Sequence, residues 1–302
     1  MAIRTFLPDT VIFREGEPGD TFYQILSGRV EIILSYETEH PIKLTDLGPG
    51  NFFGEIAVLE NYPRTASAVA SSAGVTVLEL SEDNMAENFR ENPDLVLSLM
   101  QLLGRRIVSL SEECTATQKA LADLESEDAV PVSPSLLDKA KIIADYFFGN
   151  RKAKKPSLES TLFAKDGGSI RDGAAGDVFD CDAGTVLFRD GQPGACMYAV
   201  HWGTVGIYSG YGTDNEKLLT KLNANDFFGE IGMLCGQPRS ATAVALENGT
   251  TLEIIRSDSI RPMFERNPAK VWMILDHLAR RLTHLTREYA QACRDLCEKT
   301  KS

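Results

Sequence analysis

A glutamate and an arginine occur close together in two segments of this chain. The stretch NFFGEIAVLENYPRTASAVA contains Glu55 and Arg64, and the stretch DFFGEIGMLCGQPRSATAVA contains Glu230 and Arg239 at the same spacing. A carboxylate accepts hydrogen bonds from hydroxyl groups, whereas a guanidinium presents a fork of donors that fits phosphate oxygens. The repeated pair therefore predicts two sites for a compact anion that carries both a phosphate and a hydroxyl.

A cyclic phosphodiester on a ribose with a free 2'-hydroxyl is such an anion. Its recognition also needs backbone donors, and Gly54 permits close approach of the backbone to the ligand. If GEIAVL opens a short helix, the N–H groups of residues 55 to 57 would form an anion cradle. Ala57, matched by Gly232, is small enough to leave room for the phosphate.

The elements that position these residues are duplicated with them. VIFREGEPGD at residue 11 pairs with VLFRDGQPGA at residue 186, and LLGRR pairs with HLARR, always at an offset of 175 residues. Within each copy, short runs rich in β-branched and aromatic residues alternate with glycine turns, which predicts a β-barrel or roll. One domain has been duplicated, because the period is too long for a solenoid.

A helical pattern follows each roll. Apolar positions step by three and four residues from Met100 to Leu124, and again from Leu275 to Leu296, which is the spacing of a coiled-coil seam. The boundaries predicted are a first domain with its helix at 1–126, a linker with a short helix at 127–180, and a second domain with its helix at 181–302.

The pattern F-G-E-[IL]-[AG]-x-L followed by P-R-[ST]-A-[ST] resembles the phosphate-binding cassette of cyclic nucleotide-binding domains. The likeness covers about 110 residues in each copy. It implies an α+β chain with two eight-stranded β-rolls, each followed by a long helix. It also implies that the glutamates bind ribose, and that the arginines, Thr65 and Ser240 bind phosphate. The ligand-binding positions implied are Gly54, Glu55, Ile56, Ala57, Arg64, Thr65, Ala66, Gly229, Glu230, Ile231, Gly232, Arg239, Ser240 and Ala241.

Bulk properties exclude several classes of protein. A net charge of −12 argues against a nucleic-acid binder, and no apolar run or basic leader indicates a membrane span or a signal peptide, so we expect a cytoplasmic protein. The four histidines are scattered, and neither a P-loop nor a nucleophile elbow occurs. We therefore expect neither an enzyme, a cofactor nor a metal site.

Three functions are common among cyclic nucleotide-binding proteins. We do not expect a transcription factor, because no helix-turn-helix follows the second copy, nor a channel, because no apolar spans occur. A kinase regulatory subunit would carry an inhibitory segment upstream of its first roll, which begins here within ten residues. We expect a stand-alone receptor for cyclic AMP or cyclic GMP that signals to a protein partner. The alternatives are a ligand-free assembly scaffold and a receptor for a cyclic dinucleotide.

The two helical seams also predict a quaternary arrangement. Relatives such as the catabolite activator protein pair the long helices of two rolls in parallel, and this chain contains two of each. The linker is long enough for the chain to return and make the same pairing by itself. We expect a pseudo-dimer, in which the two seams of one chain pack against each other. The alternative is a homodimer, in which the same seams pair between two chains. The residues expected to pack are Leu103, Ile107 and Leu110 against Leu278, Leu282 and Leu285.

Overall fold

A computed structural model describes residues 2–38, 41–59, 63–124, 132–144 and 177–300. The chain divides into two compact units. Unit 1 consists of Met1–Asn88, Arg106–Leu162 and Ala279–Ser302, and unit 2 consists of Phe89–Arg105 and Phe163–Leu278. Each unit contains one β-roll, and each long helix contributes residues to both units.

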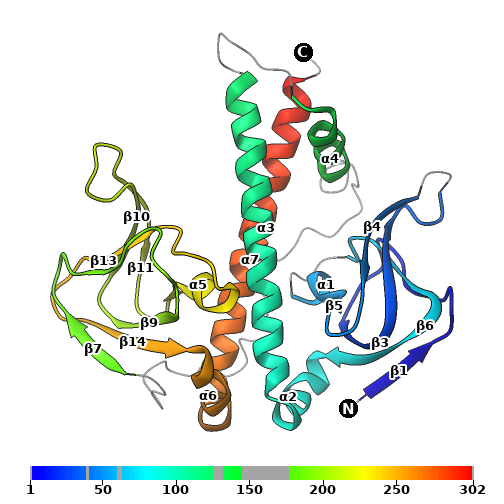
Figure 1. Cartoon of the computed structure of the whole chain (residues 1–302), viewed down its shortest axis with the longest axis horizontal. Coiled ribbons are helices and arrows are strands. Elements are labelled where there is room, and N and C mark those ends of the chain that lie inside the picture. Colours follow the sequence, from blue (N-terminus) through cyan, green and yellow to red (C-terminus); the bar gives the residue numbers. More distant parts are fainter. Residues whose placement is uncertain (1, 39–40, 60–62, 125–131, 145–176, 301–302) are drawn as a thin grey trace. The chain divides into compact units, whose positions relative to one another are not determined.

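The first roll belongs to unit 1 and is an antiparallel sheet that folds over on itself (Figure 1). A short helix, α1 (Glu55–Leu59), interrupts its strands after the FGE motif. Its strands are β1 (Ala2–Phe6), β2 (Val11–Phe13), β3 (Thr21–Leu34), β4 (Ile42–Leu47), β5 (Phe52–Phe53) and β6 (Ser67–Ser81).

The second roll belongs to unit 2 and consists of two four-stranded antiparallel sheets. Its short helix is α5 (Glu230–Cys235). Its strands are β7 (Val178–Cys181), β8 (Val186–Phe188), β9 (Cys196–Trp202), β10 (Val205–Ser209), β11 (Lys217–Leu222), β12 (Phe227–Phe228), β13 (Thr242–Ala245) and β14 (Thr250–Arg256).

The two rolls have the same course, although the strands divide differently. In the first roll, β3 runs through a bulge at Gly28, whereas the equivalent Gly203 separates β9 from β10. Both glycines have a left-handed φ, 82° and 83°, which a residue with a Cβ atom rarely adopts. A Cβ at Gly28 would lie 2.2 Å from the carbonyl oxygen of Gly74, so glycine allows β3 and β6 to approach each other closely there.

A cluster of aromatic rings fills each roll at the same positions. In the first roll, Phe13, Tyr23 and Phe53 stack with ring centroids 5.1 to 6.3 Å apart. In the second roll, the equivalent rings have centroids 5.1 to 5.9 Å apart, and they are Phe188, Tyr198 and Phe228. Successive side chains of a strand point to opposite faces, and these rings lie on the face that is turned inward.

Helices follow each roll in the same order. After the first roll come α2 (Glu82–Glu91), α3 (Asp94–Leu124) and α4 (Pro134–Ala144). After the second come a 3-10 turn (Ser257–Ser259), α6 (Ile260–Arg266) and α7 (Pro268–Lys299). The short helix predicted inside the linker is α4, and most of the remaining linker, up to residue 176, lies outside the described residues.

In unit 1, the C-terminal parts of α3 and α7 pack together beneath α4. Cys114 of α3 and Tyr289, Cys293 and Leu296 of α7 are buried in one apolar cluster with Ala140 of α4. Leu110 and Leu285, equivalent residues of the two copies, both pack against this cluster. Among the described residues, no group of three or more histidine, cysteine or acidic side chains can hold a metal ion.

In unit 2, the end of α2 and the start of α3 pack on α6 and α7. The ring of Phe89 stacks on Trp272, with centroids 5.3 Å apart, and meets Phe264 edge-on at 6.2 Å. Phe89 and Phe264 are equivalent residues of the two copies. The seam positions Leu103 and Leu278, also in unit 2, are fully buried. Within each unit, helices that follow the two rolls thus pack together inside one chain.

None of the helices in the described ranges is both long enough and apolar enough to cross a membrane.

Candidate functional site

The side chain of the cassette arginine donates to the same two carbonyl positions in both copies. Arg64 donates from Nη1 to the carbonyl oxygen of Gly54 and from Nη2 to that of Thr21, both at 2.7 Å. Arg239 donates in the same way to Gly229 at 2.6 Å and to Cys196 at 2.7 Å. These contacts fix the guanidinium planes, so each fork is oriented before any ligand binds.

The backbone of each arginine is bound to the turn that follows the second strand of its roll. The N–H of Arg64 donates to the carbonyl of Glu17, and its carbonyl accepts from the N–H of Gly16, both at 2.8 Å. Arg239 makes the same two bonds, at 2.8 Å, with Gln192 and Gly191. The repeated FREGEPG and FRDGQPG turns therefore hold the cassette arginine in place.

Both guanidinium groups are buried without a full set of acceptors. Arg64 is 3% exposed and Arg239 is 5% exposed, and within the described part of the chain the Nε of each has no hydrogen-bond partner. Cζ lies over a phenylalanine ring in both copies, 4.1 Å from the centroid of Phe13 and 4.2 Å from that of Phe188. Burial lowers the pKa of Arg64 from its ordinary value. A bound anion would supply the charge and the acceptors that these cations lack.

The glycine before each short helix adopts a backbone conformation that excludes other residues. Gly54 has φ of 78° and Gly229 has φ of 72°. A Cβ at Gly54 would lie 2.7 Å from Nη1 of Arg64, and one at Gly229 would lie 2.5 Å from Nη1 of Arg239. The FGE motif therefore needs glycine both for the left-handed turn and for the space that the guanidinium occupies.

The glutamate of each cassette is buried. Glu55 and Glu230 are 0% and 1% exposed. In unit 1, Oε1 of Glu55 lies 2.7 Å from Nη2 of Arg106, which comes from α3. Among the described residues, Oε2 of Glu55 has no hydrogen-bond partner. Glu55 thus has its charge balanced by the long helix and keeps one oxygen available to a donor.

A cavity of about 240 Å³ in unit 1 brings the predicted residues of the first copy together. Gly54, Glu55 and Arg64 line one part, and Arg106 of α3 lines it as well. Aliphatic side chains of β3 and β4 form another part of the wall. The other lining residues are Phe13, Ile32, Leu44, Thr45, Leu47, Phe53, Ala57, Thr65 and Ala66. One wall is therefore charged and another is apolar, as a nucleotide with a phosphate and a base requires.

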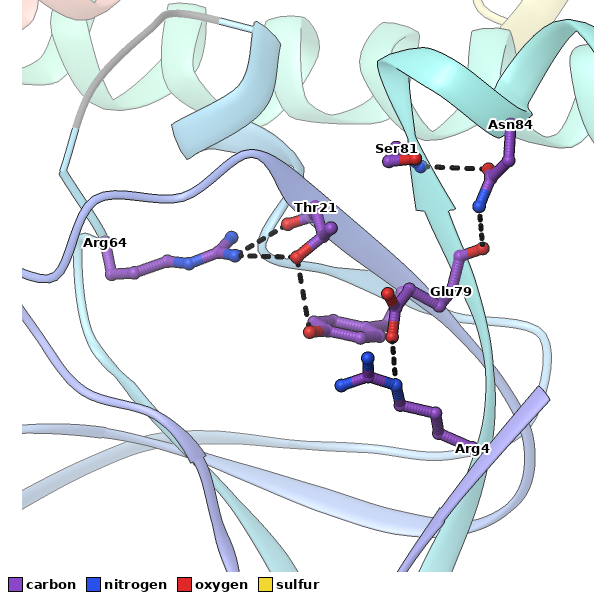
Figure 2. A network of polar contacts seen from close by, with 7 residues as sticks. Arg4, Thr21, Arg64, Glu79, Ser81 and Asn84 are labelled. Atoms are coloured by element: carbon purple, nitrogen blue, oxygen red, sulfur yellow. Dashed lines mark hydrogen bonds and ion pairs between the residues drawn. The ribbon is translucent and has the colours of Figure 1, made fainter. Parts of the chain in front are cut away.

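Figure 2 shows polar contacts at Arg64 and, separately, where β6 meets the helix that follows the roll. Nη2 of Arg64 lies 3.4 Å from Oγ1 of Thr21, which lies 3.3 Å from the hydroxyl of Tyr23. Nearby on β6, the carbonyl of Glu79 accepts from Asn84 of α2 at 3.2 Å, and Oδ1 of Asn84 accepts from the N–H of Ser81. The start of α2 is therefore bonded to β6 beside the aromatic core.

The second copy differs next to its arginine. A Cβ at Gly194 would lie 2.5 Å from Cα of Gly232, so the turn containing Gly194 lies directly against the first turn of α5. At the equivalent position in the first copy, a Cβ at Gly19 would instead meet Cζ of Arg64 at 2.4 Å. The glycine at position 232, where the first copy has Ala57, allows this closer contact.

The remaining predicted positions differ in their exposure. Ala66 and Ala241 are buried, Thr65 is half-buried in the cavity wall, and Ser240 is exposed. Ile56 and Ile231 lie in α1 and α5.

Sequence reasoning missed several participants in the two sites. These are the phenylalanine under each guanidinium, the carbonyls of Thr21 and Cys196, and Arg106. Arg106 recurs as Arg281 in the repeated LLGRR and HLARR, which was the signal for it.

The family comparison matches both copies. The family described as "Cyclic nucleotide-binding domain" matches residues 3–92 and 179–267, which include both cassettes. The chain belongs to this family. It is a tandem cyclic nucleotide-binding protein with an α+β fold, as the cassettes and the strand pattern predict.

Curated relatives match one or both copies. The chain is 26% identical over 237 residues, 78% of its length, to the cAMP-dependent protein kinase regulatory subunit of Debaryomyces hansenii, and 27% identical over 248 residues to that of Candida albicans. It spans 39% and 40% of these two relatives. Over 132 residues it is 33% identical to the CRP-like cAMP-activated global transcriptional regulator of Mycobacterium tuberculosis, covering 43% of the chain and 55% of that protein.

Solved structures also match. One is the regulatory domain of Toxoplasma gondii PKA with cAMP, 19% identical, covering 90% of this chain and 82% of that one with a TM-score of 0.27. Another is the cAMP-bound PfPKA-R fragment, 18% identical, covering 89% and 74% with a TM-score of 0.32.

Proposed function

We propose that this chain is a cyclic nucleotide receptor that binds a 3',5'-cyclic purine mononucleotide at each cassette and relays its occupancy through the long helices to a protein partner. The observation that carries this proposal is the pairing, in one cavity, of a buried guanidinium with a spare donor and a buried carboxylate with a spare oxygen. Each side chain lacks what one half of the ligand provides.

The phosphate end is argued from the arginines. Arg64 uses one hydrogen of Nη1 and one of Nη2 for carbonyls, which leaves other N–H groups for phosphate oxygens. A charge-assisted hydrogen bond contributes about 1.5–3 kcal/mol. Since the carbonyl contacts already hold the fork, little side-chain entropy is lost on binding. The same contacts at Arg239 support the same role in the second copy.

The ribose end is argued from Glu55. A 2'-hydroxyl can donate to Oε2 while Oε1 remains paired with Arg106, so the ion pair positions the carboxylate and need not break. The base would then lie toward Leu44, which lines the cavity and is 52% exposed. The cavity is smaller than the roughly 300–1,000 Å³ typical of small-molecule sites. We therefore expect the base to extend out of it.

The relay is argued from Arg106. This residue is the contact through which α3 meets the cassette carboxylate, so a ligand that bonds to Glu55 acts on a side chain of the long helix. A ligand can shift the equilibrium between two positions of a helix only if it binds more tightly to the protein in one of them. A ligand hydroxyl on Glu55 provides such a difference.

The nucleotide is proposed separately for each copy. Ser240 after the second arginine resembles the bacterial activator and favours cyclic AMP there, whereas Thr65 resembles the pattern of relatives that respond to cyclic GMP, so the first copy is left open. A protein kinase is a second candidate for the partner, because the kinase regulatory subunits match across both copies, over 78% and 81% of this chain.

Isothermal titration calorimetry on nucleotide-free protein tests the proposal. Cyclic AMP or cyclic GMP should bind with a stoichiometry of two per chain, and cyclic di-GMP serves as the competing ligand. The absence of heat with both mononucleotides would favour the ligand-free scaffold, and heat with cyclic di-GMP alone would favour the dinucleotide receptor. Mass spectrometry of the ligand that co-purifies with the protein identifies the natural nucleotide.

A further inference from the structure

Unit 2 contains a buried cluster of three ionisable side chains that the nucleotide site does not use. Nζ of Lys270 and Nε2 of His201 both contact Oε2 of Glu253, the histidine at 2.7 Å. Lys270 and Glu253 are 1% and 0% exposed, and His201 is 8% exposed. Charged side chains are almost never buried this completely unless they are paired.

The cluster joins the start of a long helix to the sheet. Lys270 lies in the first turn of α7, Glu253 on β14 and His201 on β9. The first turn of a helix carries a partial positive charge, so a buried lysine there is unfavourable without an anion. The carboxylate of Glu253 balances both the lysine and the helix terminus, and it does so across α6, which lies between β14 and α7 in the chain.

The first copy has leucine at all three equivalent positions. At an offset of 175 residues, His201, Glu253 and Lys270 correspond to Leu26, Leu78 and Leu95. Leu78 and Leu95 are each 3% exposed, whereas Leu26 is 42% exposed. Leucine side chains can make only apolar contacts, which are non-directional. A charge-assisted hydrogen bond is short and directional, and breaking a buried pair leaves an uncompensated charge.

We propose that Lys270, Glu253 and His201 form a latch that fixes the first turn of α7 on the β-roll of the second copy, so that nucleotide binding changes the α2–α3 junction and leaves the α6–α7 junction in place. The second half of this statement rests on the proposed function. The latch makes the two copies unequal. Both copies bind nucleotide, but only binding to the first copy changes the position of a long helix.

Hydrogen exchange of the full chain without nucleotide tests the latch. Glu253→Leu leaves Lys270 buried without its anion, and amide exchange of residues 268–275 should rise at least tenfold. The matched control is Asp177→Asn, which removes the exposed partner of Arg256 at 3.4 Å in the same unit and should leave exchange unchanged within twofold. Wild-type exchange rates in Glu253→Leu would overturn the latch.

A triple variant keeps the test decisive if Glu253→Leu does not fold. His201→Leu, Glu253→Leu and Lys270→Leu together install the residues of the first copy and remove every buried charge of the cluster. In wild type, saturating cyclic AMP should change exchange at residues 85–100 and not at 260–275; in the triple variant both segments should respond. Equal responses in wild type, or an unresponsive 260–275 in the triple variant, would overturn the relay. If calorimetry detects no nucleotide binding, the proposed function fails. The latch is still tested by comparing the amide exchange of residues 268–275 between the triple variant and wild type without nucleotide.

Discussion

Arg64 and Arg239 make the same contacts in the two copies, although some of the residues that supply those contacts differ. The acceptor for Nη2 is Thr21 in the first copy and Cys196 in the second, and both accept through the backbone carbonyl. The residues near the start of the second long helix differ more, because His201, Glu253 and Lys270 form a buried charged cluster where the first copy has leucine at the equivalent sequence positions. The duplication has preserved the geometry of the anion site, while the connection of each roll to its helix has diverged.

The arginines are where the two copies are most alike, and their removal should have the largest effect. Arg64→Ala and Arg239→Ala should each weaken nucleotide binding at one site at least a hundredfold, because about two charge-assisted bonds of 1.5–3 kcal/mol each are lost. Calorimetric stoichiometry should fall from two to one in either variant. Arg64→Lys, which keeps the charge and loses the fork, is the control and should bind with intermediate affinity. Two intact sites in either alanine variant would show that the arginines do not bind the phosphate.

The contact between Gly194 and Gly232 distinguishes the second copy and should have the next largest effect. A Cβ at position 232 would lie 2.8 Å from Cα of Gly194 and 3.1 Å from Nη1 of Arg239. Gly232→Ala should therefore destabilise the chain by about 1–3 kcal/mol, the usual effect of overpacking. The reverse change in the first copy, Ala57→Gly, should lower stability by only about 0.5–1 kcal/mol through helix propensity.

Urea unfolding of both variants measures this difference, and exchange of residues 190–240 locates it. A Gly232→Ala protein as stable as Ala57→Gly would show that the turn at Gly194 shifts freely.

Several of these features follow from the sequence and others do not. The cassettes, the rolls and the helical seam are predicted because their signals are local: glycine turns, runs of β-branched and aromatic residues, and apolar positions spaced by three and four residues. The helix predicted by the seam from Met100 to Leu124 is α3, Asp94–Leu124, and Met100, Leu103 and Ile107 on this seam are buried. Apolar periodicity determines which face is buried, so a single sequence is sufficient.

The contacts that were missed are of a different kind. The arginine's acceptors are backbone carbonyls, which any residue supplies, so Thr21 and Cys196 carry no common side-chain signal. Arg106 meets Glu55 only because two separate elements converge in the fold. The buried cluster was detectable in principle, because Glu253 and Lys270 are charges placed where the first copy has leucine. Comparing the copies at their differences, and not only at their identities, would have revealed it.

Arg106 tests whether the long helix is linked to ligand binding. Arg106→Gln leaves the buried Glu55 without its cation, which lowers the affinity of the first copy for nucleotide because the carboxylate is no longer held. Breaking a fully buried ion pair costs about 3–5 kcal/mol. Since the Arg106 side chain is 35% exposed, water screens part of this, and we expect a loss of about tenfold.

The neighbouring Arg105 is the matched control for this change, because it lies on the same helix and is exposed. Arg105→Gln should leave both affinities unchanged. Calorimetry on an Arg239→Ala background isolates the first copy. Equal losses of affinity in Arg106→Gln and Arg105→Gln would show that Arg106 acts only through its positive charge and not through its contact with Glu55.

The residue beneath Nη2 is the subtlest difference between the copies, and exchanging it should have the smallest effect. Nη2 lies 3.4 Å from Oγ1 of Thr21 and 3.7 Å from Sγ of Cys196, so in both copies the side chain is a weak second acceptor beside a carbonyl at 2.7 Å. Thr21→Cys and Cys196→Thr should each change nucleotide affinity at most about threefold, since a bond this long is weak and contributes about 0.5 kcal/mol. Competition binding with a fluorescent cyclic nucleotide, on backgrounds that retain one site, resolves a change of this size. A tenfold loss in Cys196→Thr would mean that the thiol itself contacts the ligand, and the second site would then differ from the first in chemistry and not only in its surroundings.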